Sequence, residues 1–102
     1  MGSIPADFRL VDGALLIGGQ KACVLPERAE TPLFVYDFAI VEARIARFRA
    51  AFPSIDLHYA LKANPFAPLV HRIVPLVDGI DVASGGEARA AIEAGMAGYC
   101  VS

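Results

Sequence analysis

Apolar residues follow two patterns along residues 31–102: short continuous runs, and longer stretches with the spacing of one helix face. The short runs predict three buried strands, near residues 33–36, 55–61 and 80–83. The longer stretches predict three helices, near residues 38–51, 65–76 and 86–94. Strands that alternate with helices favour a parallel sheet made of right-handed βαβ units. The pattern therefore predicts an α/β fold.

The first of these helices shows the packing that we expect. Its apolar positions recur at helical spacing on one face: Val41, Ile45, Phe48 and Phe52. Its charged positions fall elsewhere and predict a solvated side: Glu42, Arg44, Arg47 and Arg49. Asp37 stands just before the helix, where a carboxylate can cap the first turn. The helix should therefore cover the sheet with its apolar face.

Residues 1–30 show a different pattern and predict a separate β-rich leader. Two apolar runs, 8–11 and 14–17, flank the dipeptide Asp12-Gly13. Asp-Gly between two apolar runs favours a tight hairpin, because both turn positions take positive φ. Gly18-Gly19 predicts a second turn shortly afterwards. An isolated hairpin is only marginally stable in water, so this leader is expected to join a larger sheet.

The second predicted strand has two different faces. One face is apolar: Ile55, Leu57, Tyr59 and Leu61. The other face is mixed: Asp56, His58, Ala60 and Lys62. If the apolar face meets the helices, Lys62 points into the interior of a barrel, and the small Ala60 leaves room for a flat ring beside the amine. His58, one pleat below, is interpreted as a hydrogen-bonded interior histidine rather than a catalytic one.

A lysine at the end of a strand has two interpretations. It is either a solvated loop residue, which is the commoner case, or an amine held for covalent chemistry. Catalytic groups of parallel barrels lie at the carboxyl ends of the strands, because the loops there form the open face. Lys62 occupies such a position, so both interpretations apply to it.

The third predicted strand brings a carboxylate to the same face. With Ile80 and Val82 turned toward the helices, Asp81 shares the face of Lys62. A buried carboxylate needs a positively charged partner, which the lysine nitrogen would supply. The alternative is an acid that merely ends the turn formed by residues 78–79. The residues alone leave both interpretations open.

Helix-capping residues lie close to Lys62 and Asp81 in the sequence. Asn64-Pro65 has the composition of an N-cap followed by a first helical residue. Ser84 and Glu87 have the spacing of a capping box, which accounts for Glu87 without a role in the site. Gly85-Gly86 lacks the spaced glycines and the following lysine of phosphate-binding loops, so no nucleotide site is predicted.

Composition narrows the class of protein. The 102 residues are 56% apolar and carry a net charge of -2. This charge does not indicate binding to nucleic acid. No run is long enough to span a membrane, and no signal-peptide pattern is present. Cys23 and Cys100 form neither a disulfide framework nor a set of metal ligands, so no metal site is predicted. A reducing compartment, the cytoplasm, is expected.

Two motifs carry a family resemblance: Tyr59-Ala60-Leu61-Lys62-Ala63-Asn64 and Asp81-Val82-Ala83-Ser84-Gly85-Gly86-Glu87. Together they resemble the amino-terminal part of the fold-type III pyridoxal-phosphate-dependent decarboxylases. They resemble diaminopimelate decarboxylase closely and ornithine decarboxylase more distantly. Residues 63–65 and 78–84 also resemble the decarboxylase branch associated with exosortase-type polysaccharide loci.

The resemblance implies a fold, a cofactor and a site. The fold is the first three βα units of an alanine-racemase-like TIM barrel over residues 31–102, preceded by a leader, residues 1–30, of the family's β-domain. Lys62 would carry pyridoxal 5'-phosphate as a Schiff base, with Asp81 and Ala60 beside the cofactor. The substrate would be a small amino acid and the full-length enzyme a homodimer. Neither nucleic acid nor a membrane is expected as a partner.

The length of the chain limits what it can do alone. A complete barrel takes roughly 250 residues, so the chain corresponds to a truncated barrel. We expect it to be inactive and poorly folded by itself, because three barrel units leave an open strand edge and an apolar face uncovered. Two alternative functions stay open. One is an alanine-racemase-like enzyme, which the Pro-Phe-Ala of residues 65–67 does not fit, and the other is a non-catalytic pyridoxal-phosphate-binding protein.

Overall fold

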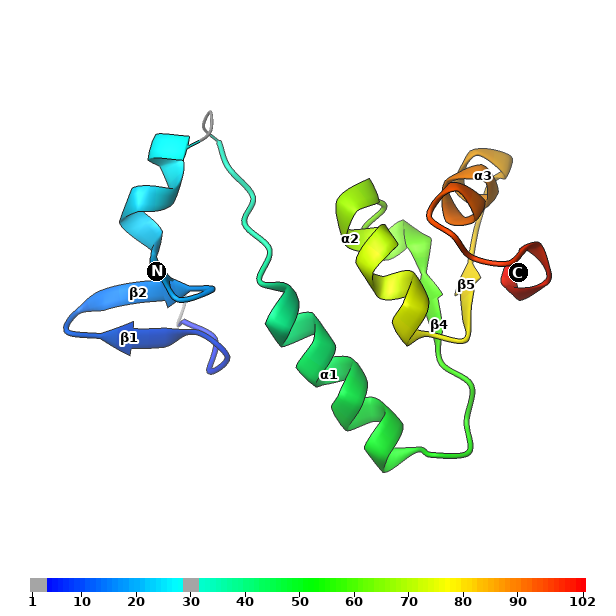
Figure 1. Ribbon diagram of the computed structural model, residues 1–102, viewed down its shortest axis with the longest axis horizontal. Helices are drawn as coiled ribbons and strands as arrows, with labels where there is room; N and C mark the ends of the chain where they lie inside the picture. Colours follow the sequence, from blue (N-terminus) through cyan, green and yellow to red (C-terminus); the bar gives the residue numbers. More distant parts are fainter. Residues whose placement is uncertain (1–3, 29–31) are drawn as a thin grey trace. The chain divides into compact units, whose positions relative to one another are not determined.

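The computed structural model of the chain describes residues 4–28 and 32–102. These residues form helices and strands, so the fold is mixed α/β (Figure 1). The chain divides into two compact units, Met1–Ala43 and Arg44–Ser102. Each unit has its own sheet.

The first unit contains a three-stranded antiparallel sheet. The strands lie in the order of the chain: β1 (Arg9–Val11), β2 (Ala14–Ile17) and β3 (Gln20–Lys21). Both connecting turns fall where the sequence predicts turns. Their residues have positive φ: Asp12 (51°), Gly13 (76°), Gly18 (58°) and Gly19 (79°). A 3-10 helix, η1 (Ala22–Arg28), follows the sheet. Whether this sheet joins a β-domain stays a prediction.

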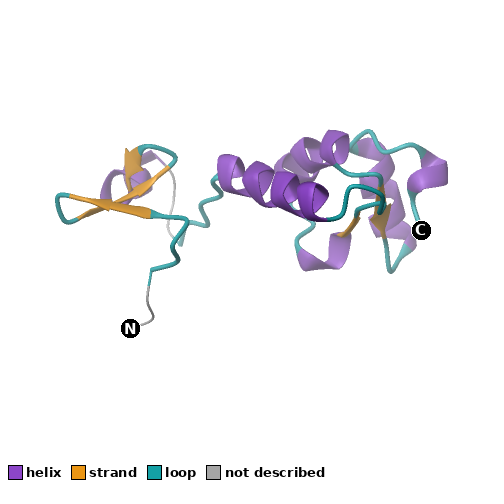
Figure 2. Ribbon diagram, turned by 90° about the horizontal axis from the view of Figure 1, so that it is seen from below, coloured by secondary structure: helices purple, strands orange, loops and turns teal. Residues whose placement is uncertain are grey.

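The strand predicted near residues 33–36 is wrong. The segment is irregular and enters no β-ladder among the described residues, and Figure 2 shows a loop where it leads into the next helix. Its side chains are exposed, that of Phe34 to 82%. A strand persists only when a neighbouring strand satisfies its backbone N–H and C=O groups. The described residues provide no such neighbour, so the apolar run alone does not make a strand.

Helix α1 spans Phe38–Ala51, the bounds that the sequence predicts. Asp37 caps it, because its Oδ1 accepts a hydrogen bond from the Ala39 N–H at 3.0 Å. Its Oδ2 accepts one from the Gly18 N–H at 3.1 Å, which fastens the turn after β2. The predicted apolar stripe is not buried: Val41 and Ile45 are only half-buried, and Phe48 is exposed. The prediction is thus right in the bounds and wrong in the burial.

The second unit is built on two short parallel strands. In β4 (His58–Ala60) and β5 (Gly79–Asp81), Tyr59 lies opposite Ile80. Val101 then forms a parallel bridge with Ile80. Segments that follow one another along the chain therefore pair side by side in the same direction, as the predicted βαβ array requires.

Helical segments follow each strand: η2 (Leu61–Ala63), α2 (Ala67–Ile73) and η3 (Val74–Leu76) after β4, and α3 (Gly85–Glu93) and η4 (Gly98–Cys100) after β5. The N-cap predicted at Asn64 is wrong, since Phe66 is the N-cap and α2 begins two residues after the predicted start at Pro65, with Pro68 in its first turn. The Asn64 side chain instead accepts a hydrogen bond from the Phe66 N–H at 3.1 Å. This bond closes a local turn in front of the helix, which is the other common role of asparagine.

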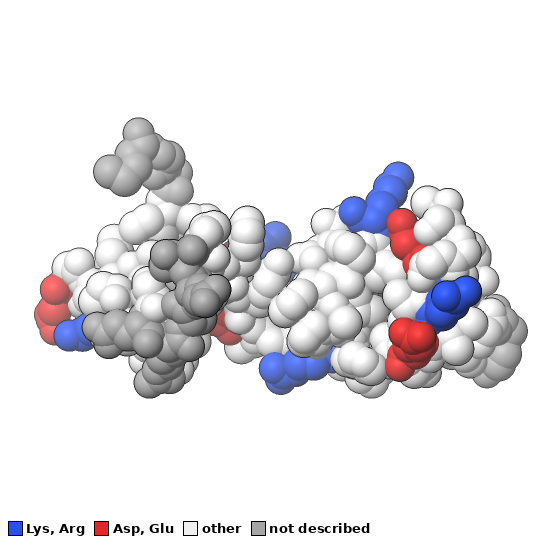
Figure 3. Space-filling view, turned by 90° about the horizontal axis from the view of Figure 1, so that it is seen from above, with Lys and Arg blue, Asp and Glu red and all other residues white. Residues whose placement is uncertain are grey.

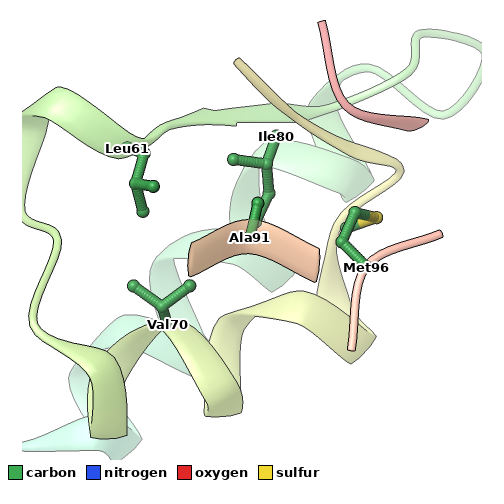
Figure 4. Packing of buried hydrophobic residues seen from close by; sticks show 5 residues of the cluster. All are labelled: Leu61, Val70, Ile80, Ala91 and Met96. Atoms are coloured by element: carbon green, nitrogen blue, oxygen red, sulfur yellow. The ribbon is translucent and has the colours of Figure 1, made fainter. Parts of the chain in front are cut away.

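The hydrophobic core of the second unit lies between the strands and the two α-helices that follow them. Its buried residues are Leu61, Val70, Ile80, Ala91 and Met96. Figure 4 shows Leu61 and Ile80 pointing from the strand side toward Val70 and Ala91. Ile80 of β5 has no exposed surface and Tyr59 of β4 is half-buried against the same core, as the predicted facing requires, whereas Ile55 lies outside β4 and is 54% exposed. By the alternation of a strand, Ala60 and Asp81 lie on the opposite face.

The amino end of α3 carries the cap that the sequence predicts. The Ser84 Oγ accepts a hydrogen bond from the Glu87 N–H at 3.1 Å. The Glu87 Oε1 accepts one from the Ala83 N–H at 3.1 Å, one residue earlier than in a standard capping box. Gly95 adopts the left-handed conformation (φ 103°) at the other end.

Candidate active site

A small hollow opens at the carboxyl ends of β4 and β5. Its volume is about 170 Å³. The lining comes from these strand ends, the turn after β4 and the first turn of α3: Ala60, Lys62, Asp81, Val82, Ala83 and Glu87. Ligands of parallel α/β folds bind at this end of the strands. The structure therefore brings all three predicted site residues, Ala60, Lys62 and Asp81, to one hollow.

Lys62 lies two residues beyond β4, in the 3-10 turn η2 (Leu61–Ala63). Leu61 is fully buried and anchors this turn, whereas the Lys62 side chain is exposed. Lys62 makes no ion pair with the described residues, so the predicted pairing with Asp81 does not occur in this structure. An exposed amine at the rim of a hollow is accessible to a carbonyl compound.

Asp81 is held through one of its carboxylate oxygens. The Ser102 Oγ donates to Oδ1 at 2.6 Å, and the His58 Nδ1 lies 3.1 Å from the same atom. These bonds keep the pKa of the Asp81 carboxyl below its ordinary value, the Ser102 hydroxyl being the larger cause. The Asp81 side chain is 57% exposed, so the predicted burial is wrong. Within the second unit, residues 44–102 place no further layer over this face of the sheet, which leaves the carboxylate in contact with water.

His58 is hydrogen-bonded, as predicted, but it is not an interior residue. Its side chain is 36% exposed. Its ring lies against Gly79, the residue opposite it in β5. A Cβ atom on Gly79 would come within 2.6 Å of the His58 Cε1, so only glycine permits this approach.

A second polar cluster lies at the amino ends of the same two strands. Arg49 of α1 donates to the Leu76 carbonyl from Nε and Nη2 at 3.2 and 3.0 Å. Its Nη1 lies 3.0 Å from the Asp78 Oδ2, which also accepts from the Leu57 N–H at 2.7 Å. The pKa of the Asp78 carboxyl is therefore lowered, chiefly by Arg49. Arg49, predicted to lie on a solvated face, instead belongs to this cluster, which the sequence pattern does not indicate.

The remaining surface offers fewer clues. On the face that Figure 3 shows, acidic and basic side chains lie in small separate groups. Within residues 4–28 and 32–102, no group of His, Cys, Asp and Glu side chains could hold a metal ion. In the same ranges no helix combines the length and apolar character needed to cross a bilayer.

Several curated proteins with similar sequences are diaminopimelate decarboxylases. The chain is 39% identical over 85 residues to a diaminopimelate decarboxylase of Aquifex aeolicus, an alignment that covers 83% of this chain and 20% of that protein. The Bacillus subtilis protein of the same name is 39% identical over 88 residues, with 82% and 20% covered. This chain is similar to the amino-terminal part of the diaminopimelate decarboxylases. The resemblance that the two motifs indicate is thus confirmed.

The chain spans about a fifth of the length of the diaminopimelate decarboxylases it matches. A third relative, from Actinosynnema pretiosum, is 36% identical over 92 residues, 90% of this chain and 21% of that protein. No family model matches the chain, and no solved structure matches it. The roles of Lys62, Ala60 and Asp81 are therefore proposals, which the geometry of the hollow supports.

Proposed function

We propose that this chain supplies the cofactor-binding lysine of a pyridoxal-phosphate-dependent amino-acid decarboxylase, and that Lys62 is this lysine. One observation carries the proposal. Lys62 presents an exposed amine at the carboxyl end of a parallel strand, beside Asp81, within a segment similar to the diaminopimelate decarboxylases. A lysine amine so placed can attack the aldehyde carbon of the cofactor.

The lining of the hollow fits the aldehyde end of pyridoxal phosphate. Lys62 provides the nucleophile, and the small side chains of Ala60 and Ala83 leave room beside it. The carboxylates of Asp81 and Glu87 favour a positively charged nitrogen and repel a phosphate. We therefore expect the phosphate to be held outside this hollow. When bound, the cofactor accepts the electrons left by departing CO₂.

The proposal includes the finer features that the family resemblance implies. These are successive βα units of a TIM barrel within residues 31–102, the first without its predicted strand in this structure, a leader that joins a β-domain, a homodimer and a cytoplasmic location. The parallel order of β4, β5 and Val101 supports the barrel, because successive strands of a barrel lie side by side. Diaminopimelate, which the relatives' name specifies, is the first substrate to test.

Covalent trapping tests the role of Lys62. The chain has two lysines, so Lys21→Ala is a matched control for Lys62→Ala. The chain is incubated with pyridoxal phosphate, reduced with borohydride, digested and mapped by mass spectrometry. We expect the label on Lys62 in preference to Lys21, retained in Lys21→Ala and lost in Lys62→Ala. Equal labelling of both lysines would contradict the proposed role.

A second assay identifies the reaction. Release of CO₂ from diaminopimelate is measured for the 102-residue chain and for any longer product that contains it. Because the chain spans a fifth of its relatives, we expect decarboxylation only in the longer product. Racemisation without CO₂ would indicate a racemase instead, and cofactor binding without either reaction would indicate a non-catalytic carrier.

A further inference from the structure

The carboxylate of Asp81 uses its two oxygens unequally. Both hydrogen bonds, from the Ser102 Oγ at 2.6 Å and the His58 Nδ1 at 3.1 Å, end on Oδ1. Among the described residues no hydrogen bond reaches Oδ2. Two donors on one oxygen fix the rotation of the carboxylate and leave the other oxygen as an acceptor. Asp81 lines the hollow that contains Lys62, so an acceptor is available there.

The first donor, His58, is held in place by the neighbouring strand. Its ring packs on Gly79, where an added Cβ would lie 2.6 Å from Cε1 and 2.8 Å from Nδ1. Gly79 is the residue opposite His58, and Asp81 lies two residues further along β5. The His58 ring therefore extends along β5, from Gly79 toward the carboxylate of Asp81. This arrangement requires a glycine below the ring and a donor at Nδ1.

The second donor, Ser102, is held by its backbone. Its N–H donates to the Ile80 carbonyl at 3.0 Å, and its own carbonyl accepts from the Val82 N–H at 2.7 Å. These bonds place Ser102 beside β5. They direct its hydroxyl to the residue between Ile80 and Val82. That residue is Asp81, so both donors reach the carboxylate from fixed positions.

We infer that His58 and Ser102 are positioning residues of the candidate site, which hold Asp81 by Oδ1 and keep Oδ2 available as the acceptor for the nitrogen of Lys62 when that lysine holds the cofactor, since the two side chains are not paired in this structure. The inference rests on the proposed function for the role of Lys62. The lowered pKa of Asp81 agrees with it, because the carboxylate must be ionised to accept this bond. Neither His58 nor Ser102 needs to touch the cofactor.

The first test needs no cofactor. The side-chain carboxyl carbon of Asp81 is titrated by NMR in the 102-residue chain and in three variants: His58→Phe, His58→Asn and Ser102→Ala. We expect the midpoint to rise in His58→Phe and Ser102→Ala and to stay low in His58→Asn, because asparagine keeps an N–H donor near the position of Nδ1. Far-UV circular dichroism checks that each variant is folded. A midpoint that is the same in all four proteins overturns the inference.

The second test measures Lys62 itself. Its labelling by pyridoxal phosphate and borohydride should fall about two- to five-fold in His58→Phe and Asp81→Asn, the range of an exposed charged pair. Labelling should recover in His58→Asn, and the double variant of His58 and Asp81 should lose no more than Asp81→Asn alone. Unchanged labelling in His58→Phe, with Lys62 still selectively labelled, overturns the inference and leaves the proposed function standing. If Lys62 is not selectively labelled in the unmodified chain, the proposed function is contradicted instead. In that case the titration of Asp81 decides whether His58 and Ser102 position the carboxylate.

Discussion

Arg49 and Asp78 form an ion pair that ties the last turn of α1 to the start of β5, with 3.0 Å between Nη1 and Oδ2. The other two guanidinium nitrogens bind the Leu76 carbonyl, so one planar group satisfies a carbonyl and a carboxylate together. The Leu57 N–H binds the same Asp78 oxygen. The start of both strands is thus joined to α1 through two side chains.

Replacing Arg49 by lysine should weaken this junction. A lysine has one nitrogen and cannot bind the carbonyl and the carboxylate in the same geometry. We expect the melting temperature of Arg49→Lys to fall by about 2–5 °C, as measured by circular dichroism. Arg47→Lys is the matched control, because Arg47 is an exposed residue of the same helix. Equal melting temperatures of the two variants would show that the junction contributes nothing.

Acid should destabilise the chain through Asp78. Its folded pKa lies below the ordinary value of 3.8, chiefly because Arg49 and then the Leu57 N–H stabilise the carboxylate. Such a group stabilises the fold above its unfolded pKa and loses this effect as the pH falls through the folded pKa. We expect the urea midpoint to drop as the pH falls below about 4. Asp78→Asn should flatten this part of the profile and Asp56→Asn should not. Asp81, whose pKa is also lowered, adds a loss of the same sign.

Gly79→Ala should destabilise the second unit. The new Cβ would lie 2.6 Å from the His58 ring and 2.7 Å from the Cys100 carbonyl oxygen, which belongs to the backbone and cannot rotate away. Overpacking of this kind costs about 1–3 kcal/mol, measurable by urea denaturation. Gly85→Ala is the control, because nothing lies within 4 Å of a Cβ there. If both substitutions leave the unfolding free energy unchanged, the close approach of His58 to β5 is not real.

Ser84→Ala should remove the amino-terminal cap of α3. The Glu87 N–H would lose its acceptor, now at 3.1 Å, at a cost of about 1 kcal/mol. Ser54→Ala changes an exposed serine outside any helix and serves as the control. Urea denaturation of both variants measures the difference, and a Ser84→Ala chain as stable as the control would exclude a stabilising cap.

Local signals in the sequence predicted the parts of the fold that depend on neighbouring residues. Asp37 caps α1 and Ser84 caps α3, because each side chain reaches backbone N–H groups two or three residues ahead. The facing of Leu61 and Ile80 also follows from alternation alone. The irregular backbone at residues 33–36 could not be predicted in this way, because an apolar run forms a strand only with a partner that lies far away in the sequence.

The candidate site, too, was predicted only where neighbouring residues determine it. Alternation places Asp81 on the face that leads to Lys62, and both residues line the hollow. The hydrogen-bond partners of Asp81 could not be predicted, since they are set by the strand register, which brings together residues about twenty positions apart. The exposure of Asp81 was likewise missed, because it depends on which layers cover the sheet.

The parallel pairing keeps a constant interval along the sequence. Asp81 lies opposite Ala60 and contacts Ser102, which is 21 residues further on, and the same interval separates Ile80 from its bridge partner Val101. Successive residues of a strand face opposite sides, so the gain or loss of one residue between β5 and Val101 would turn Ser102 toward the core and move a different side chain next to Asp81. Insertions and deletions in this connection should therefore impair the site more than substitutions of its exposed residues. The length of the connection, counted in residues, sets which chemical group meets the carboxylate.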